Sequence, residues 1–299
     1  MEKHRFHYHA SAHALSGELT RPVQHMIEVQ AGISLPSTGG VGSSHVENFR
    51  VDEVVSFKRG YSHVSGSVKK ENGTITHTTH ATATIEGLNI LDLVTADRIV
   101  ARLSSSYEEP APNKPKPSEG KVLLIGSRFE NLRIAGCQTD VELHHSLFLD
   151  LDTFGAAQAK WNEEEFRMMV EDTRTALEVG EALPQELKLD RALLCSIVKE
   201  VHFKEPGFEK SEKEENQDQE GKKKKGKGQK EYRQKHPCPG VERIGRHRFR
   251  VVDFGNIFLA EVLCHHGRKT LTMLRVELGS PNGGGFTGAE ASSNGLPPW

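Results

Sequence analysis

Four histidines have the types and spacings that come nearest to a chemical site. His7 and His9 are two residues apart, which on a strand places both on one face. His77 and His80 flank a pair of threonines further along the chain. Zinc sites usually combine a fixed local spacing with a second cluster of ligands, and this sequence has neither. Surface or turn histidines are therefore the favoured interpretation. The four stay candidate metal ligands because ligands can come from distant segments.

The motifs of several enzyme classes are absent or incomplete. Residues 221–227 match the G-x-x-x-x-G-K part of a phosphate-binding loop, but Gly228 stands where Ser or Thr is required, inside a charged run. The sequence contains no nucleophile elbow, dinucleotide fingerprint, kinase signature or EF-hand loop. It therefore identifies no catalytic residue and predicts no cofactor. Scattered cysteines without a C-x-x-C pair are expected to be buried thiols rather than disulfides: Cys137, Cys195, Cys238 and Cys264.

A short pattern recurs in the first half of the chain. Residues 46–51, 85–90 and 129–134 each read apolar, Glu, Asn or Gly, apolar, polar, apolar. The pattern is typical of strands with one buried face, and Asn or Gly at the third position favours a bulge or tight bend. An internal β repeat is the prediction. The repeated acids could form a cluster, but the polar positions of such strands more simply face water: Glu47, Glu86 and Glu130.

Composition excludes some classes of partner. The 299 residues include 39 Lys+Arg and 41 Asp+Glu, without the basic excess of a dedicated nucleic-acid binder, so nucleic acid is not an expected partner. No apolar run approaches the roughly 18 residues of a membrane-spanning helix, so no membrane span is predicted. The first residues lack the apolar stretch of a secretory signal. We therefore expect a cytoplasmic protein.

The order of predicted elements indicates a mainly β protein. Residues 5–150 are rich in β-branched and small polar residues, with Asn72-Gly73 as a hairpin turn. Asn162 and Glu165 could form a capping box for a helix that ends near Gly180, and a second short helix could run from Pro184 towards Leu194. The prediction is antiparallel sheets packed as a sandwich or barrel, with a helical insertion at 160–194. A β-solenoid is the alternative, because a repeat of roughly 40 residues could stack.

The predicted domain comprises residues 1–206 and 237–279, followed by an irregular tail at 280–299. Residues 207–236 interrupt it with ten Lys+Arg and seven Asp+Glu, and such charge-rich composition is typical of disorder. Closing a shorter loop costs slightly less entropy. Replacing Gly207 to His236 with a short Gly/Ser linker should therefore leave the melting temperature within a few degrees, as thermal unfolding would show.

Two segments carry a resemblance. Ile85-Glu86-Gly87-Leu88-Asn89-Ile90 and residues 271–279 look like parts of an uncharacterised group of bacterial β-rich proteins. Residues 10–136 are loosely similar to choice-of-anchor surface proteins, which alternate Gly-Leu strands with Ser/Thr-rich ones. Neither resemblance implies catalytic residues. Two function classes stay open. The favoured one is a non-enzymatic structural module that binds a protein partner or copies of itself, and the other is a metal-dependent enzyme that uses dispersed His, Asp and Glu.

Overall fold

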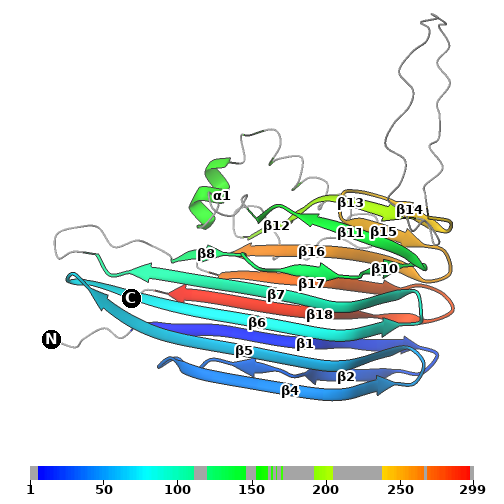
Figure 1. Cartoon of the computed structure of the whole chain (residues 1–299), viewed down its shortest axis with the longest axis horizontal. Coiled ribbons are helices and arrows are strands. Elements are labelled where there is room, and N and C mark those ends of the chain that lie inside the picture. The colour runs from blue at the N-terminus through cyan, green and yellow to red at the C-terminus, as the bar shows by residue number, and fades with distance from the viewer. Residues whose placement is uncertain are drawn as a thin grey trace, which may run out of the picture.

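The protein folds as two antiparallel β-sheets packed face to face, which confirms the predicted sandwich (Figure 1). It is neither a closed barrel nor a solenoid. The computed structural model describes residues 6–110, 120–145, 153–160, 163, 166, 170, 192–204, 238–265 and 268–296. Among these residues no helix is long and apolar enough to cross a membrane.

The first sheet, sheet A, joins the start of the chain to its end. Its strand order is β14-β15-β16-β17-β18-β1-β2, with β12 beside β16 and β3 beside β1. The strands are β1 (His7–Arg21), β2 (His25–Gln30), β3 (Ile33–Ser34), β12 (Ala192–Ser196), β14 (Val241–Arg243), β15 (Arg248–Val251), β16 (Gly255–His265), β17 (Arg268–Leu278) and β18 (Gly283–Leu296).

The second sheet, sheet B, is built from the middle of the chain. Its strand order is β13-β11-β10-β7-β6-β5-β4, with β8 and β9 pairing to β7. The strands are β4 (Gly40–Val51), β5 (Val55–Glu71), β6 (Thr74–Ile90), β7 (Val94–Glu108), β8 (Lys121–Leu123), β9 (Arg128–Glu130), β10 (Arg133–Ile134), β11 (Cys137–Leu143) and β13 (Val198–Lys204).

The core lies between the sheets because each long strand buries alternate side chains. In β6, for example, Ala81, Ala83 and Ile85 are fully buried while His80 is exposed. The Asn72-Gly73 hairpin turn is confirmed: both residues have positive φ, and β5 pairs with β6 on either side of them. Such two-residue turns match the twist of antiparallel strands.

The three recurring segments share a bend in sheet B. They lie in β4, in β6 and across β9 and β10, and their third residues have positive φ: Asn48 (53°), Gly87 (65°) and Asn131 (50°). Asn and Gly tolerate this left-handed conformation best. Glu47 pairs with Arg59 and Phe49 with Phe57, so one residue on each strand is skipped and the register is kept. The feature is thus a tight bend, and it explains why the apolar positions here are three residues apart.

Sheet A contains the same kind of bend with a different residue type. Ala260 in β16 and Ala289 in β18 both have a φ of 50°. The pairing again passes over them, because Leu259 pairs with Leu274 and Glu261 pairs with Thr272. Alanine has no special tolerance for this conformation, so the bend in sheet A left no recognisable pattern in the sequence.

Two expectations from the sequence were wrong. The segment at 280–299 is not an irregular tail: β18 occupies residues 283–296 and lies in the middle of sheet A, between β1 and β17. Small residues there allow the neighbouring strands to approach closely, and they resemble loop composition when read alone. Cys137 and Cys238 form a disulfide, although all four cysteines are buried as expected. These two residues are 101 positions apart, so the sequence offered no local sign of the pairing.

The helical region is described only in part. Helix α1 spans Phe154–Lys160, earlier than the predicted start of the insertion. Phe166 and Val170, both within the predicted helix, are helical and buried. Glu163 is a bend, and the remaining residues of the predicted helix at 162–180 and of the second helix up to residue 191 lie outside the described residues. Leu194, at its predicted end, belongs to strand β12. The charged segment at 207–236 also lies outside them.

Candidate functional site

The outer face of sheet B, which points away from sheet A, presents the most regular set of polar groups. On β5, β6 and β7 the residues between the buried positions face outward, and cross-strand pairing aligns them in rows. One row contains His63, Thr82 and Arg102, and the next contains Ser65, His80 and Ser104. The sheet therefore gathers on one surface groups that are distant in the sequence.

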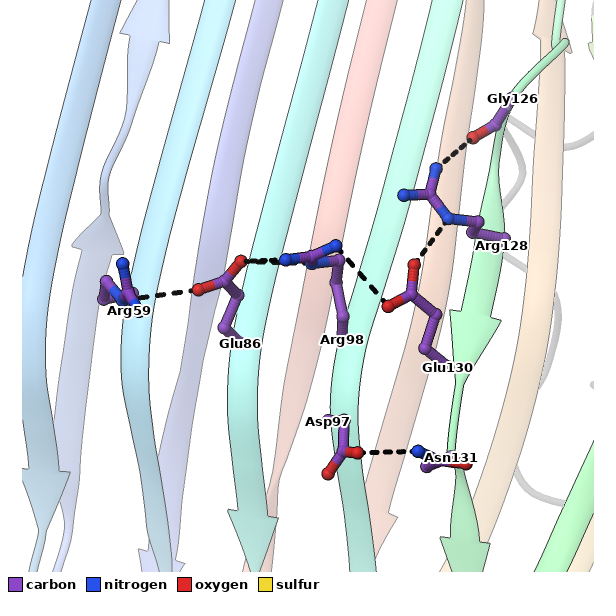
Figure 2. A network of polar contacts seen from close by, with 8 residues as sticks. All are labelled: Arg59, Glu86, Asp97, Arg98, Gly126, Arg128, Glu130 and Asn131. Carbon is purple, nitrogen blue, oxygen red and sulfur yellow. Dashed lines mark hydrogen bonds and ion pairs between the residues drawn. The ribbon is translucent and has the colours of Figure 1, made fainter.

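An alternating ladder of charges crosses this face at the bend (Figure 2). Glu86 accepts hydrogen bonds from Arg98 Nε and Nη2 at 3.0 and 2.7 Å, and its other oxygen lies 3.3 Å from Arg59 Nε. Arg98 Nη1 continues to Glu130 at 3.5 Å, and Glu130 accepts from Arg128 Nε at 2.7 Å. Glu47 on β4 lies opposite Arg59 in the strand register, at the outer end of the row.

The charges of the ladder are paired with one another, so they connect neighbouring strands and are not available to bind a ligand. Hydrogen bonding to Glu86, with the nearby charge of Glu130, raises the pKa of Arg98. Beside it, Asn131 Nδ2 donates to Asp97 Oδ2 at 2.7 Å, which fastens the segment after β9 to β7 (Figure 2). The glutamates of the three recurring segments thus face solvent, as expected, and two of them, Glu86 and Glu130, are neutralised by arginines.

A second group on the outer face has no such neutralisation. We call His63, His80 and Arg102 the histidine–arginine cluster; all three are exposed. Burial against the sheet, with the charges of Arg102 and His63, lowers the pKa of His80. The fold therefore holds three basic groups close enough to disfavour protonation of the central one.

The edge of sheet B beyond these rows is open. β4 is 12 residues long, and within the described residues it pairs with β5 on one side and with no strand on the other. β4 and the outer strand β2 of sheet A lie along the same lower edge of the sandwich (Figure 1). Exposed apolar residues occur on or next to these two strands: Val23, Met26, Val29 and Val41.

The four candidate metal histidines are distributed over different surfaces. His7 and His9 lie on β1 in sheet A and are exposed, whereas His77 and His80 lie on β6 in sheet B. His77 is buried and His80 exposed, because residues three apart on a regular strand point to opposite faces. The described chain has one group of three possible ligands within 4.8 Å, formed by Glu142, Glu200 and His202, and none of the four predicted histidines belongs to it.

His77 instead connects the two sheets at one end of the core. Its Nδ1 lies 2.9 Å from Tyr8 Oη on β1, and its Nε2 lies 2.9 Å from Glu109 Oε1. Phe6 stacks on the imidazole with ring centroids 4.2 Å apart. Burial raises the pKa of Tyr8, with a further contribution from Glu109, so this phenol is not poised as a nucleophile. We interpret the group as a structural tie between the sheets.

Another polar group lies on the outer face of sheet A, and it escaped the sequence analysis. The bend of sheet A lies between His13 and Ser16, so both side chains face the same way. Ser16 Oγ lies 3.1 Å from His13 Nε2. Glu290 Oε1 lies 4.0 Å from His13 Nδ1, too far for a hydrogen bond. Ser16 Oγ also contacts Thr287 Oγ1 at 2.9 Å. A hydroxyl, an imidazole and a carboxylate follow one another here as in a hydrolase triad. Because the imidazole and the carboxylate are not hydrogen-bonded, we interpret the group as a surface hydrogen-bond network.

Comparison with known proteins identifies the family without an activity. Neither the search of curated proteins nor that of solved structures found a match. No similarity to choice-of-anchor surface proteins is shown. A sequence profile described as a domain of unknown function, DUF8256, matches residues 6–265, which includes all of sheet B and sheet A through the end of β16. The chain therefore belongs to the DUF8256 family.

Proposed function

We propose that the protein is a non-enzymatic β module that associates with copies of itself through its open edge strand β4. The observation that carries this proposal is the length of β4, 12 residues with no partner strand on its outer side in the described structure. An unpaired edge presents a row of backbone N–H and C=O groups that can hydrogen-bond to another strand.

The sequence of β4 supports pairing rather than protection. Natural edge strands are often shielded by lysine or proline, and β4 (GVGSSHVENFRV) contains neither. The other edge strands are shorter: β2 has six residues, β14 has three, and β13 has seven with lysines at positions 199 and 204. β4 is thus the edge best suited to accept a strand.

A second copy of this chain is the partner that fits the charge and the surface. The formal net charge of −2 gives little repulsion between copies. Two β4 strands related by a two-fold axis pair antiparallel, which is the arrangement already used throughout sheet B. Val41, which lies on β4 itself and is 73% exposed, would lie beside the contact and lose solvent exposure.

We expect Val41→Lys to weaken self-association, because it places a charge on each copy at the shared edge. The dissociation constant should rise at least about tenfold, equivalent to about 1.4 kcal/mol. Sedimentation velocity over a range of concentrations measures it. Val252→Lys is the matched control: Val252 is also exposed but lies between β15 and β16 of sheet A, away from β4.

Wild-type protein that sediments as a monomer at every concentration would contradict the proposal. Equal weakening by both lysine variants would place the contact away from β4.

A metal-dependent activity is the second candidate function, supported by one observation. Glu142 on β11 and Glu200 and His202 on β13 hold a His/Glu/Glu set, the ligand types that bind zinc and similar ions. Lys199 already neutralises Glu142 at 2.7 Å, which weighs against a tight site. Elemental analysis of purified protein, compared with His202→Ala, tests it: stoichiometric metal lost in the variant would favour this candidate.

A further inference from the structure

We propose that the histidine–arginine cluster, His63, His80 and Arg102, binds an oxyanion of the phosphate or sulfate class. This site is separate from the edge contact and does not depend on self-association. The ligand would lie on the outer face of sheet B, over the centre of β6, and accept hydrogen bonds from one guanidinium and two imidazoles.

The strand register places the three basic groups around one point. Thr82 pairs with His63 on β5 and with Arg102 on β7, and His80 is the next outward residue on β6. His80 is therefore a diagonal neighbour of both, at a distance of about 7–8 Å between backbones that long side chains can bridge. Hydroxyls of the same rows surround it and could donate to a ligand: Ser43, Ser65, Thr82 and Ser104.

The charge of Arg102 is left uncompensated on the described outer face. No carboxylate pairs with Arg102 within the described residues. Arg128, one row away, and Arg59 and Arg98, two rows away, all contact glutamates. The lowered pKa of His80, caused by its partial burial and then by Arg102 and His63, agrees with a cluster of like charges. An anion would remove that repulsion, and bidentate hydrogen bonding is the geometry in which arginine recognises phosphate.

The fold fixes the backbone of Arg102 firmly enough to serve recognition. Ser127 Oγ accepts from the Arg102 N–H at 3.0 Å and donates to its carbonyl at 3.3 Å. Gly126 packs against the aliphatic part of the side chain: a Cβ added there would lie 3.2 Å from Arg102 Cδ. The backbone and the aliphatic part of the Arg102 side chain are thus both supported by the segment before β9.

Binding should depend on pH through the imidazoles. An anion favours the protonated form of His80, so it raises the pKa of that group, and affinity increases as the pH falls through that pKa. At higher pH only Arg102 supplies charge. Other titratable or charged groups on the strands of this face are His45, Glu47, Lys58, Arg59, Tyr61, Lys69, Glu86, Asp97, Arg98, Glu108, Lys121, Arg128, Glu130 and Arg133.

The test follows the imidazole C–H resonances of His63 and His80 by NMR while inorganic phosphate, and separately sulfate, is added to the full chain. Sodium chloride keeps the ionic strength constant, at a slightly acidic pH. We expect saturable shifts of both histidines and an upward shift in the pKa of His80. Arg102→Gln should weaken binding at least about tenfold, because it removes a charged hydrogen-bond donor. Arg128→Gln, which removes the same charge from the ladder, should leave the affinity within about twofold.

Linear shifts without saturation, or equal weakening by Arg102→Gln and Arg128→Gln, would show general charge screening and overturn the proposal. A phosphate monoester and a sulfate monoester extend the test to the source of the group. Binding of both free ions and both esters supports an oxyanion site. The ester that binds more tightly then shows whether the natural ligand carries a phosphate or a sulfate group. Binding of none of the four overturns it, even if the edge contact is confirmed.

Discussion

We expect reduction of the Cys137–Cys238 disulfide to lower the free energy of unfolding by about 2–5 kcal/mol. Cys137 begins β11 in sheet B, and Cys238 lies just before β14 in sheet A, so the bond connects the two sheets. The 101-residue separation also includes the charged segment, and cross-linking so long a loop removes much of the entropy of the unfolded chain.

Chemical denaturation of wild-type protein with and without a thiol reductant measures this effect. The Cys137→Ala/Cys238→Ala double variant provides the control, because reductant should not change its stability. Thiol titration of the unfolded chain checks the bond directly: two reactive thiols, from Cys195 and Cys264, should be found before reduction. Four thiols before reduction would show that the bond had not formed.

Thiol titration also tests the predicted location of the protein in the cell. Cytoplasmic glutathione and thioredoxin keep most thiols reduced, whereas disulfides persist in oxidising environments. Protein recovered from its native cells under conditions that trap thiols should therefore carry a free Cys137 if the predicted cytoplasmic location holds. An intact bond in those cells would argue for an oxidising compartment instead.

Local chemistry explains which parts of the fold could be predicted from the sequence. The β5–β6 hairpin was predictable because Asn72-Gly73 allows positive φ at two consecutive residues between β-rich runs. The bend in sheet B carried Asn or Gly in all three segments, whereas the bend in sheet A uses Ala260 and Ala289 and was missed. β18 was missed because its glycines and serines resemble a loop until β1 and β17 are placed on either side.

The candidate sites depended on contacts that no single stretch of sequence contains. His63, His80 and Arg102 lie on three strands and become neighbours only once the register is fixed. A one-residue slip of β6 would turn His80 into the core. The unpaired edge of β4 likewise follows from strand order, since its composition resembles that of the interior strands. Spacing within the chain drew attention to His7, His9, His77 and His80, which the fold distributes over separate surfaces.

The second large effect is expected at Arg275 on β17, which neutralises a buried carboxylate. Glu261 Oε2 and Oε1 accept from Arg275 Nε at 2.6 Å and Nη2 at 2.9 Å, and Glu261 is 6% exposed. The guanidinium also lies 3.5 Å from the ring centre of Phe258. His247 Nε2 lies 3.8 Å from Glu261 Oε1, farther than an ordinary hydrogen bond.

Burial by itself would raise the pKa of Glu261, but the hydrogen bonds and charge of Arg275, helped by His247, lower it to about 2. A carboxyl group whose pKa is lower in the folded state stabilises the fold above its unfolded pKa. This contribution should be complete above roughly pH 4.5 and should disappear as the pH falls towards 2.

Arg275→Met should therefore destabilise the protein by about 3–5 kcal/mol at neutral pH, because it leaves a buried carboxylate without its partner while keeping an apolar stem over Phe258. The variant should regain part of this loss as the pH falls, since the pKa of Glu261 rises and the neutral acid tolerates burial. Denaturation at several pH values measures this recovery. Arg98→Met, which removes an arginine from the surface ladder, is the control and should show no comparable recovery at low pH. Adding Glu261→Gln to Arg275→Met should restore much of the stability. If the double variant is no more stable than Arg275→Met, the cost comes from lost packing on Phe258 and not from the unpaired charge.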